Sequence, residues 1–294
     1  MQADQTTEAI AADPCTPIQK LSQLTRNLIP VLTLASSRGT AILAQFAAQL
    51  VVGTMAGAGA LGALQLLTSW TCIAGEALGL GLPTRAMRLV SINYEQQQRE
   101  QILQILRESR RKILRLWLIL ALLAALPVIF LVRATETSTW TEYSWLLIGA
   151  AIAAPLFSLT RLYAESLKAT GAALAAVTIE NLTSPLALLL VCAYCWLAGH
   201  PVVIFTLVIT FGLSLAITPA ALKHRLKLQL AALPQPAPPS CNTYALPKVE
   251  RGDLFYLWGT GVLSIGFLHL PFVVMPLYVD TAQIGVFAVA HKFI

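Results

Sequence analysis

Long apolar runs separated by short charged segments fill most of this 294-residue chain. An α-helix needs about 20 apolar residues to cross the hydrocarbon layer of a bilayer, and runs of that length recur along the sequence. Alternating short strands, which would indicate a β-barrel, are absent, so the spanning elements should be helices. We expect an eighth helix to begin near Gln283, after seven membrane spans at 33–55, 60–82, 113–132, 144–163, 171–198, 201–222 and 254–279. The glycine-rich segment 55–60 is expected to form the turn between the first two spans.

The composition also indicates a membrane protein. Apolar residues make up 56% of the chain and charged residues only 12%, and the mean hydropathy is +0.69. A soluble domain of this length would need more charge on its surface. We therefore predict an all-α, polytopic transmembrane helix bundle.

The basic residues indicate how the bundle is oriented. Lys and Arg are retained on the cytoplasmic side of short loops. If the N-terminus is cytoplasmic, 19 of the 20 basic residues fall on that side and only Arg133 faces out. A wrong number of spans would have scrambled this asymmetry, so the orientation and the span count support each other. The net charge of +6 then reflects topology, and nucleic-acid binding is not expected.

We divide the chain into four parts. Residues 1–28 form a polar cytoplasmic tail, 29–222 a six-helix transmembrane lobe, 223–253 a cytoplasmic proline-rich linker, and 254–294 the start of a second transmembrane lobe. About 12 residues follow Gln283, and as a helix they rise only about 18 Å, which is too short to cross. We expect either a surface or re-entrant helix there or a sequence that is a fragment.

Segment 91–116 carries Ile102, Leu103, Ile105, Leu106 and Ile113 among many charges. This pattern predicts an amphipathic helix along the inner membrane surface, anchored to phospholipid. Docking of a partner protein is the alternative.

Two acids lie inside predicted spans, Glu76 and Glu180. An ionised carboxylate in the bilayer costs several kcal/mol on any scale, so such a group normally faces water, pairs with a base or stays protonated. Glu76, Glu180 and the neighbouring Asn181 are our candidates for coupling to H⁺ or Na⁺. The alternative is that each acid is a structural hydrogen-bonding group or lies close to the headgroups. Gly75, one turn before Gly79, is expected to serve close helix packing.

Four further polar residues are candidates for lining a substrate cavity. Gln45 and Gln49 share a helical face because they are four residues apart, Gln65 belongs to the next span, and Arg38 precedes them. Amides and an arginine facing a cavity suit a polar, anionic or sugar-bearing substrate. For Arg38 alone, a topological role at the inner interface is the favoured interpretation, and a cavity role is the alternative.

Motifs for other chemistry are absent. The sequence contains no GxxxxGK[ST], HExxH or GxSxG segment. Cys192 and Cys195 have redox-motif spacing but lie within an apolar helix, and five cysteines at irregular spacing do not predict a disulfide framework. We expect no enzyme activity, no metal and no cofactor, and any energy for transport must come from an ion gradient or the membrane potential.

The order of these features resembles the multidrug/oligosaccharidyl-lipid/polysaccharide exporter superfamily, especially Wzx-type O-antigen and polysaccharide flippases. The similar features are a helix pair with a short outer turn at 53–62, the segment GLGLPTRAMRL, a basic first inner loop, four more helices and a long inner loop. The segment GVFAVAHKF (285–293) resembles a "GxYxxAxK"-like run of the second lobe, with Phe287 where a tyrosine is common. The resemblance implies a first six-helix lobe of a MATE-like transporter followed by the opening of a second lobe.

The resemblance also implies a function. We predict a multi-pass inner-membrane flippase that moves a polyprenyl-diphosphate-linked glycan between leaflets, with membrane lipids and H⁺ or Na⁺ as further partners. An ion-coupled drug or cation antiporter of the same fold is one alternative. A non-transporting membrane scaffold or inactive truncated protein is the other.

Overall fold

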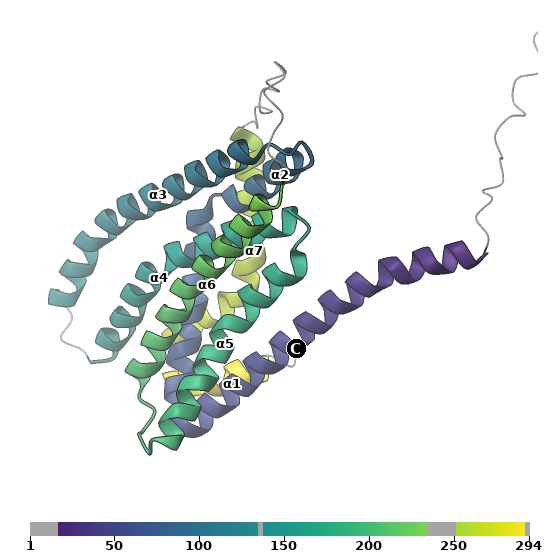
Figure 1. Cartoon of the computed structure of the whole chain (residues 1–294). Helices are drawn as coiled ribbons and strands as arrows, with labels where there is room; N and C mark the ends of the chain where they lie inside the picture. The colour runs from purple at the N-terminus through teal and green to yellow at the C-terminus, as the bar shows by residue number, and fades with distance from the viewer. Residues whose placement is uncertain (1–16, 135–137, 234–250, 292–294) are drawn as a thin grey trace, which may run out of the picture.

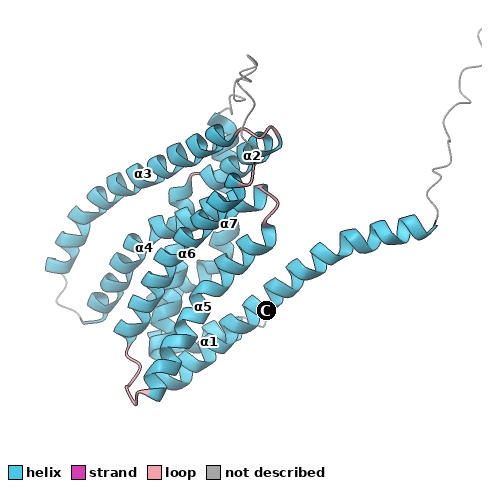
Figure 2. Cartoon of the chain, in the orientation of Figure 1, coloured by secondary structure: helices cyan, strands magenta, loops and turns pink. Residues whose placement is uncertain are grey.

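The computed structural model describes the backbone of residues 17–134, 138–233 and 251–291, and the side chains of 28–29, 31–122, 145–233 and 255–291. The described residues are helical throughout, apart from short connections, and contain no strand (Figures 1 and 2). The helices are α1 (Pro17–Gly79), α2 (Leu82–Glu95), α3 (Arg99–Ala134), α4 (Ser138–Ala169), α5 (Ala173–Leu197), α6 (Ile204–Ala231), α7 (Arg251–Val274), the 3-10 turn η1 (Met275–Leu277) and α8 (Thr281–Ala290). The prediction of an all-α bundle is confirmed.

The first helix, α1, folds back on itself at Gly57. The backbone there has φ 86° and ψ 168°, a combination open essentially only to glycine. Gln49 and Gln65 would lie about 24 Å apart along a straight helix, yet their side chains are hydrogen-bonded at 3.3 Å. Residues 17–56 and 58–79 therefore form two arms, called here the first and second arm, which diverge from the turn (Figure 1). The predicted turn at 55–60 is confirmed.

Five helices are long and apolar enough to cross a membrane: Val31–Gly79, Trp145–Ala169, Ala173–Leu197, Ile204–Ala231 and Phe255–Leu277. The first of these contains both arms of α1 and so accounts for two predicted spans. The other four match predicted spans in position, although α6 continues nine residues beyond the predicted end at 222. The protein is a multi-pass membrane protein.

The expected eighth helix is α8, which has 10 residues. Its rise of about 15 Å is too short to cross a membrane, in agreement with the expectation. The third predicted span, 113–132, coincides with the second half of α3, but the side chains beyond Leu122 lie outside the described residues.

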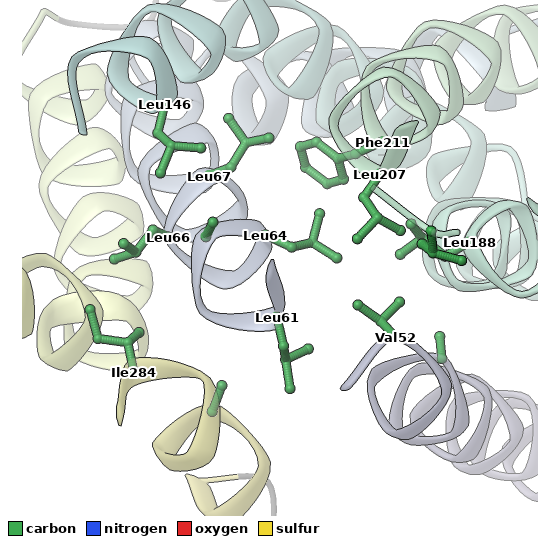
Figure 3. Close-up of a cluster of buried hydrophobic side chains, with 14 of the residues drawn as sticks. Val52, Leu61, Leu64, Leu66, Leu67, Leu146, Leu188, Leu207, Phe211 and Ile284 are labelled. Atoms are coloured by element: carbon green, nitrogen blue, oxygen red, sulfur yellow. The ribbon is translucent and has the colours of Figure 1, made fainter. Parts of the chain in front are cut away.

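A large apolar core joins α1 to helices α4, α5, α6, α7 and α8, and part of it is drawn in Figure 3. Val52 from the first arm and Leu64 from the second point toward Leu207 and Phe211 of α6 (Figure 3). Ile284 of α8 belongs to the same cluster and is fully buried. Many large apolar side chains remain exposed on the outside of the described bundle, among them Trp145, Leu190, Phe205 and Phe267. Surfaces of this kind are stable against lipid and not against water.

A second buried cluster corrects the prediction for segment 91–116. Ile102, Ile105, Leu106 and Ile113 of α3 are buried in one cluster with residues of α2, α4, α5 and α6. The segment is an amphipathic helix, but its apolar side packs on protein, so the prediction that it anchors in phospholipid was wrong. The periodicity reports that one face is apolar and does not identify what covers that face.

Glycines allow two close helix crossings. A Cβ at Gly75 would lie 2.6 Å from Cδ1 of Phe157 on α4, and Ser158 of α4 donates a hydrogen bond to the Gly75 carbonyl oxygen. Gly62 of α1 and Gly285 of α8 meet even more closely, so that a Cβ at either position would overlap backbone atoms of the other helix. The packing role expected for Gly75 is confirmed, whereas a Cβ at Gly79 would make only an ordinary contact, 3.5 Å from Cδ of Pro83.

The structure describes the predicted tail and linker only in part. Residues 234–250 of the predicted linker and most of the predicted tail lie outside the described residues. α7 and α8 both pack against α1, so the predicted start of a second lobe contacts the first lobe directly.

Candidate transport cavity

A cavity of about 530 Å³ lies between the two arms of α1 and helices α4, α5 and α6, with Ile265 of α7 also in its lining. Its volume falls within the range of about 300–1,000 Å³ that is usual for small-molecule sites. The charged and polar lining residues are Arg38, Gln45, Gln49, Gln65, Thr68, Thr160, Arg161, Lys168, Glu180, Asn181, Ser184 and Thr218. Six of the seven predicted site residues therefore meet around one space. The seventh, Glu76, lies beside the cavity and contacts the lining residue Arg161.

Five charged side chains from three helices form a connected group, called here the charged network. It consists of Glu76 of α1, Arg161, Glu165 and Lys168 of α4, and Glu180 of α5. Arg161 lies 3.7 Å from Glu76, 3.5 Å from Glu165 and 3.3 Å from Glu180. Lys168 lies 2.9 Å from Glu165 and 3.3 Å from Glu180. Glu180, the acid within the apolar sequence of α5, is thus paired with two bases.

Helical periodicity explains how α4 contributes three members. Arg161, Glu165 and Lys168 follow the spacing i, i+4 and i+7, which places them on one face. The chain then turns at Gly171, where φ is +84°, and α5 runs back alongside α4. Glu180 lies two turns into α5 and therefore faces the last turns of α4.

The charged network lies near the end of the bundle opposite the Gly57 turn. Arg38 and Glu76 are each 19 residues from Gly57 in sequence, which corresponds to about 28 Å of helix. The hydrocarbon layer is about 30 Å thick, so if Gly57 lies at one interface, both charges lie near the other. The side chains of Glu76, Glu165 and Glu180 are 14–16% exposed and that of Arg161 is 32% exposed. The geometry therefore agrees better with acids that pair with a base or lie near the headgroups than with free carboxylates at the bilayer centre.

The network carries a surplus of negative charge. Three carboxylates face one guanidinium and one ammonium, which gives a formal charge of −1. Arg38, in the cavity lining, forms no ion pair within the described part of the chain.

A chain of polar groups lies between the charged network and the Gly57 turn. Gln49 Nε2 donates to Gln65 Oε1 at 3.3 Å, and Gln65 Nε2 donates to Ser69 Oγ at 3.5 Å. Ser69 Oγ is in turn 2.9 Å from His269 Nδ1 on α7. Gln49 is 7% exposed, and its Oε1 has no hydrogen-bond partner among the described residues. This buried acceptor belongs to a side chain that lines the cavity.

Other polar residues of α5 are largely committed to their own helix. Asn181 Nδ2 donates to the Val177 carbonyl at 2.9 Å, and Thr183 Oγ1 donates to that of Ile179 at 2.6 Å. Asn181 still lines the cavity. Cys192 and Cys195 are buried free thiols, and no group of potential metal ligands occurs among the described residues.

Five contributing residues were not predicted as site residues: Arg161, Glu165, Lys168, Ser69 and His269. Arg161 and Lys168 were used only as markers of orientation, although their spacing with Glu165 indicates a shared charged face. Ser69 and His269 are 200 residues apart, and nothing in the sequence pattern points to their contact.

No protein-family model, curated protein or solved structure matches this chain. The fold and the cavity define a multi-pass membrane protein with a polar cavity between its helices.

Proposed function

We propose that the protein is a transporter of the flippase type, which moves a lipid-linked oligosaccharide or polysaccharide precursor across the inner membrane. In this proposal the described helices correspond to a six-helix lobe of a MATE-like exporter and the opening of a second lobe. The observation that carries the proposal is the cavity of about 530 Å³, whose lining holds three basic residues, one acid and three glutamines among membrane-length helices.

Polar and charged groups among spanning helices are costly unless water, a partner or a substrate reaches them. A lipid-linked glycan has an apolar tail, a diphosphate and a hydroxyl-rich head. The cavity can take the head while the tail stays in the bilayer. Arg38 suits the diphosphate, because a guanidinium binds phosphate oxygens in a bidentate manner and no described acid competes for it. The distribution of basic residues along the sequence supports placing the charged network at the cytoplasmic end.

Coupling to an ion fits the same geometry. The charged network has one more carboxylate than it has bases, so one bound H⁺ or Na⁺ would neutralise it. Glu76 and Glu180 come from different helices and both contact Arg161. Uptake of a cation at either acid would weaken the ion pair between that acid and Arg161. This would change the contacts that join α1, α4 and α5.

The transport proposal is tested with the full chain reconstituted into vesicles. The probe is a fluorescently labelled polyprenyl diphosphate linked to a single sugar, and dithionite quenching from outside reports its leaflet. Vesicles with protein should move the probe faster than vesicles without protein, and Arg38→Ala should slow this movement. Arg107→Ala is the matched control, because this exposed arginine of α3 lies outside the cavity. Equal rates with and without protein would remove the proposal.

A drug or cation antiporter is the second candidate, and the formal charge of −1 on the network favours it. A cationic substrate would bind among Glu76, Glu165 and Glu180 in competition with Arg161. The test adds tetraphenylphosphonium to reconstituted vesicles that contain a pH-sensitive dye. A proton flux that depends on this cation and disappears in Glu180→Gln would favour the antiporter over the flippase.

A further inference from the structure

The cavity has two chemically different ends. Arg38 and Gln49 are 11 residues apart on the first arm, which corresponds to about 16 Å along the helix. Ser37 Oγ and Thr178 Oγ1 are 3.0 Å apart, so the Arg38 end adjoins the part of α5 that bears Glu180. The opposite end is uncharged and is formed by glutamines of both arms.

We propose that Gln49 forms a hydroxyl-binding subsite at this uncharged end, which recognises the sugar of the substrate and not its diphosphate. This inference rests on the proposed function and specifies which part of the substrate lies where. It starts from the Gln49 side chain, which is more than nine-tenths buried, lines the cavity and leaves Oε1 without a partner among the described residues.

A buried polar atom without a partner is unfavourable, so a ligand or water that supplies the missing hydrogen bond is favoured there. Oε1 is an acceptor and needs a donor. Phosphate oxygens of an ionised diphosphate only accept and would be repelled, whereas a hydroxyl group donates.

A hydroxyl group also fits if both glutamine amides are turned over, although a phosphate oxygen could then accept a hydrogen bond as well. Ser69 and His269 can each donate or accept, so both amides could be turned over with every bond of the chain preserved. Gln49 would then present a free Nε2 donor in place of Oε1. A hydroxyl group satisfies both arrangements because it donates and accepts, and this makes it the ligand class that fits best.

Depth in the membrane supports the assignment. Gln49 and Gln65 are each eight residues from Gly57, about 12 Å of helix. If Gly57 lies at one interface, both glutamines lie well inside the hydrocarbon layer. The charged network lies near the opposite interface. A substrate that keeps its diphosphate at the charged end and extends its sugar toward the glutamines would satisfy both ends without burying a phosphate deep in the bilayer.

The test compares two ligands on purified full-length protein by calorimetry: farnesyl diphosphate, and the same lipid carrying one N-acetylglucosamine. Wild type should bind the sugar-bearing lipid about 2- to 12-fold more tightly, the range expected for one net hydrogen bond. Gln49→Met keeps nearly the same volume and should lose this preference while binding farnesyl diphosphate as wild type does. Gln104→Met, on the exposed side of α3, is the matched control and should keep the preference.

The outcomes separate this inference from the proposed function. If wild type prefers the sugar-bearing lipid and Gln49→Met keeps that preference, the subsite is wrong and the flippase proposal stands. If wild type binds both lipids equally, water fills the site and the inference fails. If neither lipid binds, both proposals fail. Should Gln49→Met not fold, deoxy-sugar analogues on wild type replace it, and affinity that is independent of every hydroxyl overturns the subsite.

Discussion

Gln49 and Gln65 share a hydrogen bond of 3.3 Å, and each lies eight residues from Gly57, one before it and one after it. This symmetry means that the two arms of α1 meet in register about a single residue. The reversal depends on the backbone of Gly57, because φ 86° with ψ 168° is strained for any residue with a Cβ. The cavity between the arms depends on the same residue.

Replacing Gly57 by alanine should therefore destabilise the protein by about 1–3 kcal/mol. The cause is backbone strain alone, since no atom lies within 4 Å of an added Cβ. Gly212→Ala in α6 also meets open space, but there the backbone is helical, and it should be neutral or raise stability by up to about 1 kcal/mol. Thermal unfolding in detergent measures both variants. Equal behaviour of the two would show that the arms do not depend on this backbone conformation.

The crossing of α1 and α8 gives a second prediction. A Cβ at Gly62 would overlap the carbonyl oxygen of Thr281, which cannot move away without moving the helix. Gly62→Ala should cost about 1–3 kcal/mol and push α8 away from α1. Gly59→Ala lies on the same arm, where a Cβ would be 3.7 Å from Thr281 Oγ1, and should be tolerated. Protease sensitivity near α8 reports the displacement, and unchanged cleavage in Gly62→Ala would contradict the packing.

The charged network predicts an order of mutational effects. Arg161 contacts three carboxylates. Arg161→Met leaves Glu165 and Glu180 with Lys168 and removes the base that pairs with Glu76, so it should be strongly destabilising. Glu180→Gln leaves two acids and two bases and should cost much less. The double variant should be less destabilised than the sum of the single variants, with a coupling energy of about 0.5–3 kcal/mol. Chemical unfolding of the two single variants and the double variant measures this coupling energy, with Arg107→Met as control. Strictly additive effects would contradict a shared network.

The sequence predicted those properties that belong to one segment at a time. The lengths of the apolar runs located α5 and α7 within a few residues, because solubility in lipid depends on the composition of a single helix. Glycine at 55–60 located the reversal for the same local reason. Ile102 and Ile113 belong to an apolar face whose covering was misassigned as lipid, because amphipathic periodicity is the same whether lipid or protein covers the apolar side.

The site residues also divide into those that one segment identifies and those that depend on contacts between segments. Arg38, Gln45 and Gln49 were identified because a polar residue in a spanning helix is costly unless something satisfies it. What satisfies Glu76 could not be read from the sequence, since its partner Arg161 lies 85 residues away on another helix. The contact of Ser69 with His269 depends likewise on how α7 packs against the second arm.

Water access to the cavity decides between a transporter and a closed scaffold. Single cysteines are placed in a background that lacks all five native cysteines and are exposed to a charged, membrane-impermeant thiol reagent. Gln45→Cys and Asn181→Cys should react, because both side chains line the cavity. Leu190→Cys should not react, since this side chain is 70% exposed on the outside of the bundle, where lipid would cover it. Charged reagents need water to reach a thiolate, so reaction only at the cavity positions means that the space is hydrated from at least one side of the membrane. If Gln45→Cys and Asn181→Cys are as unreactive as Leu190→Cys in vesicles and react only in detergent, the cavity is sealed, and a non-transporting scaffold is favoured over both transport functions.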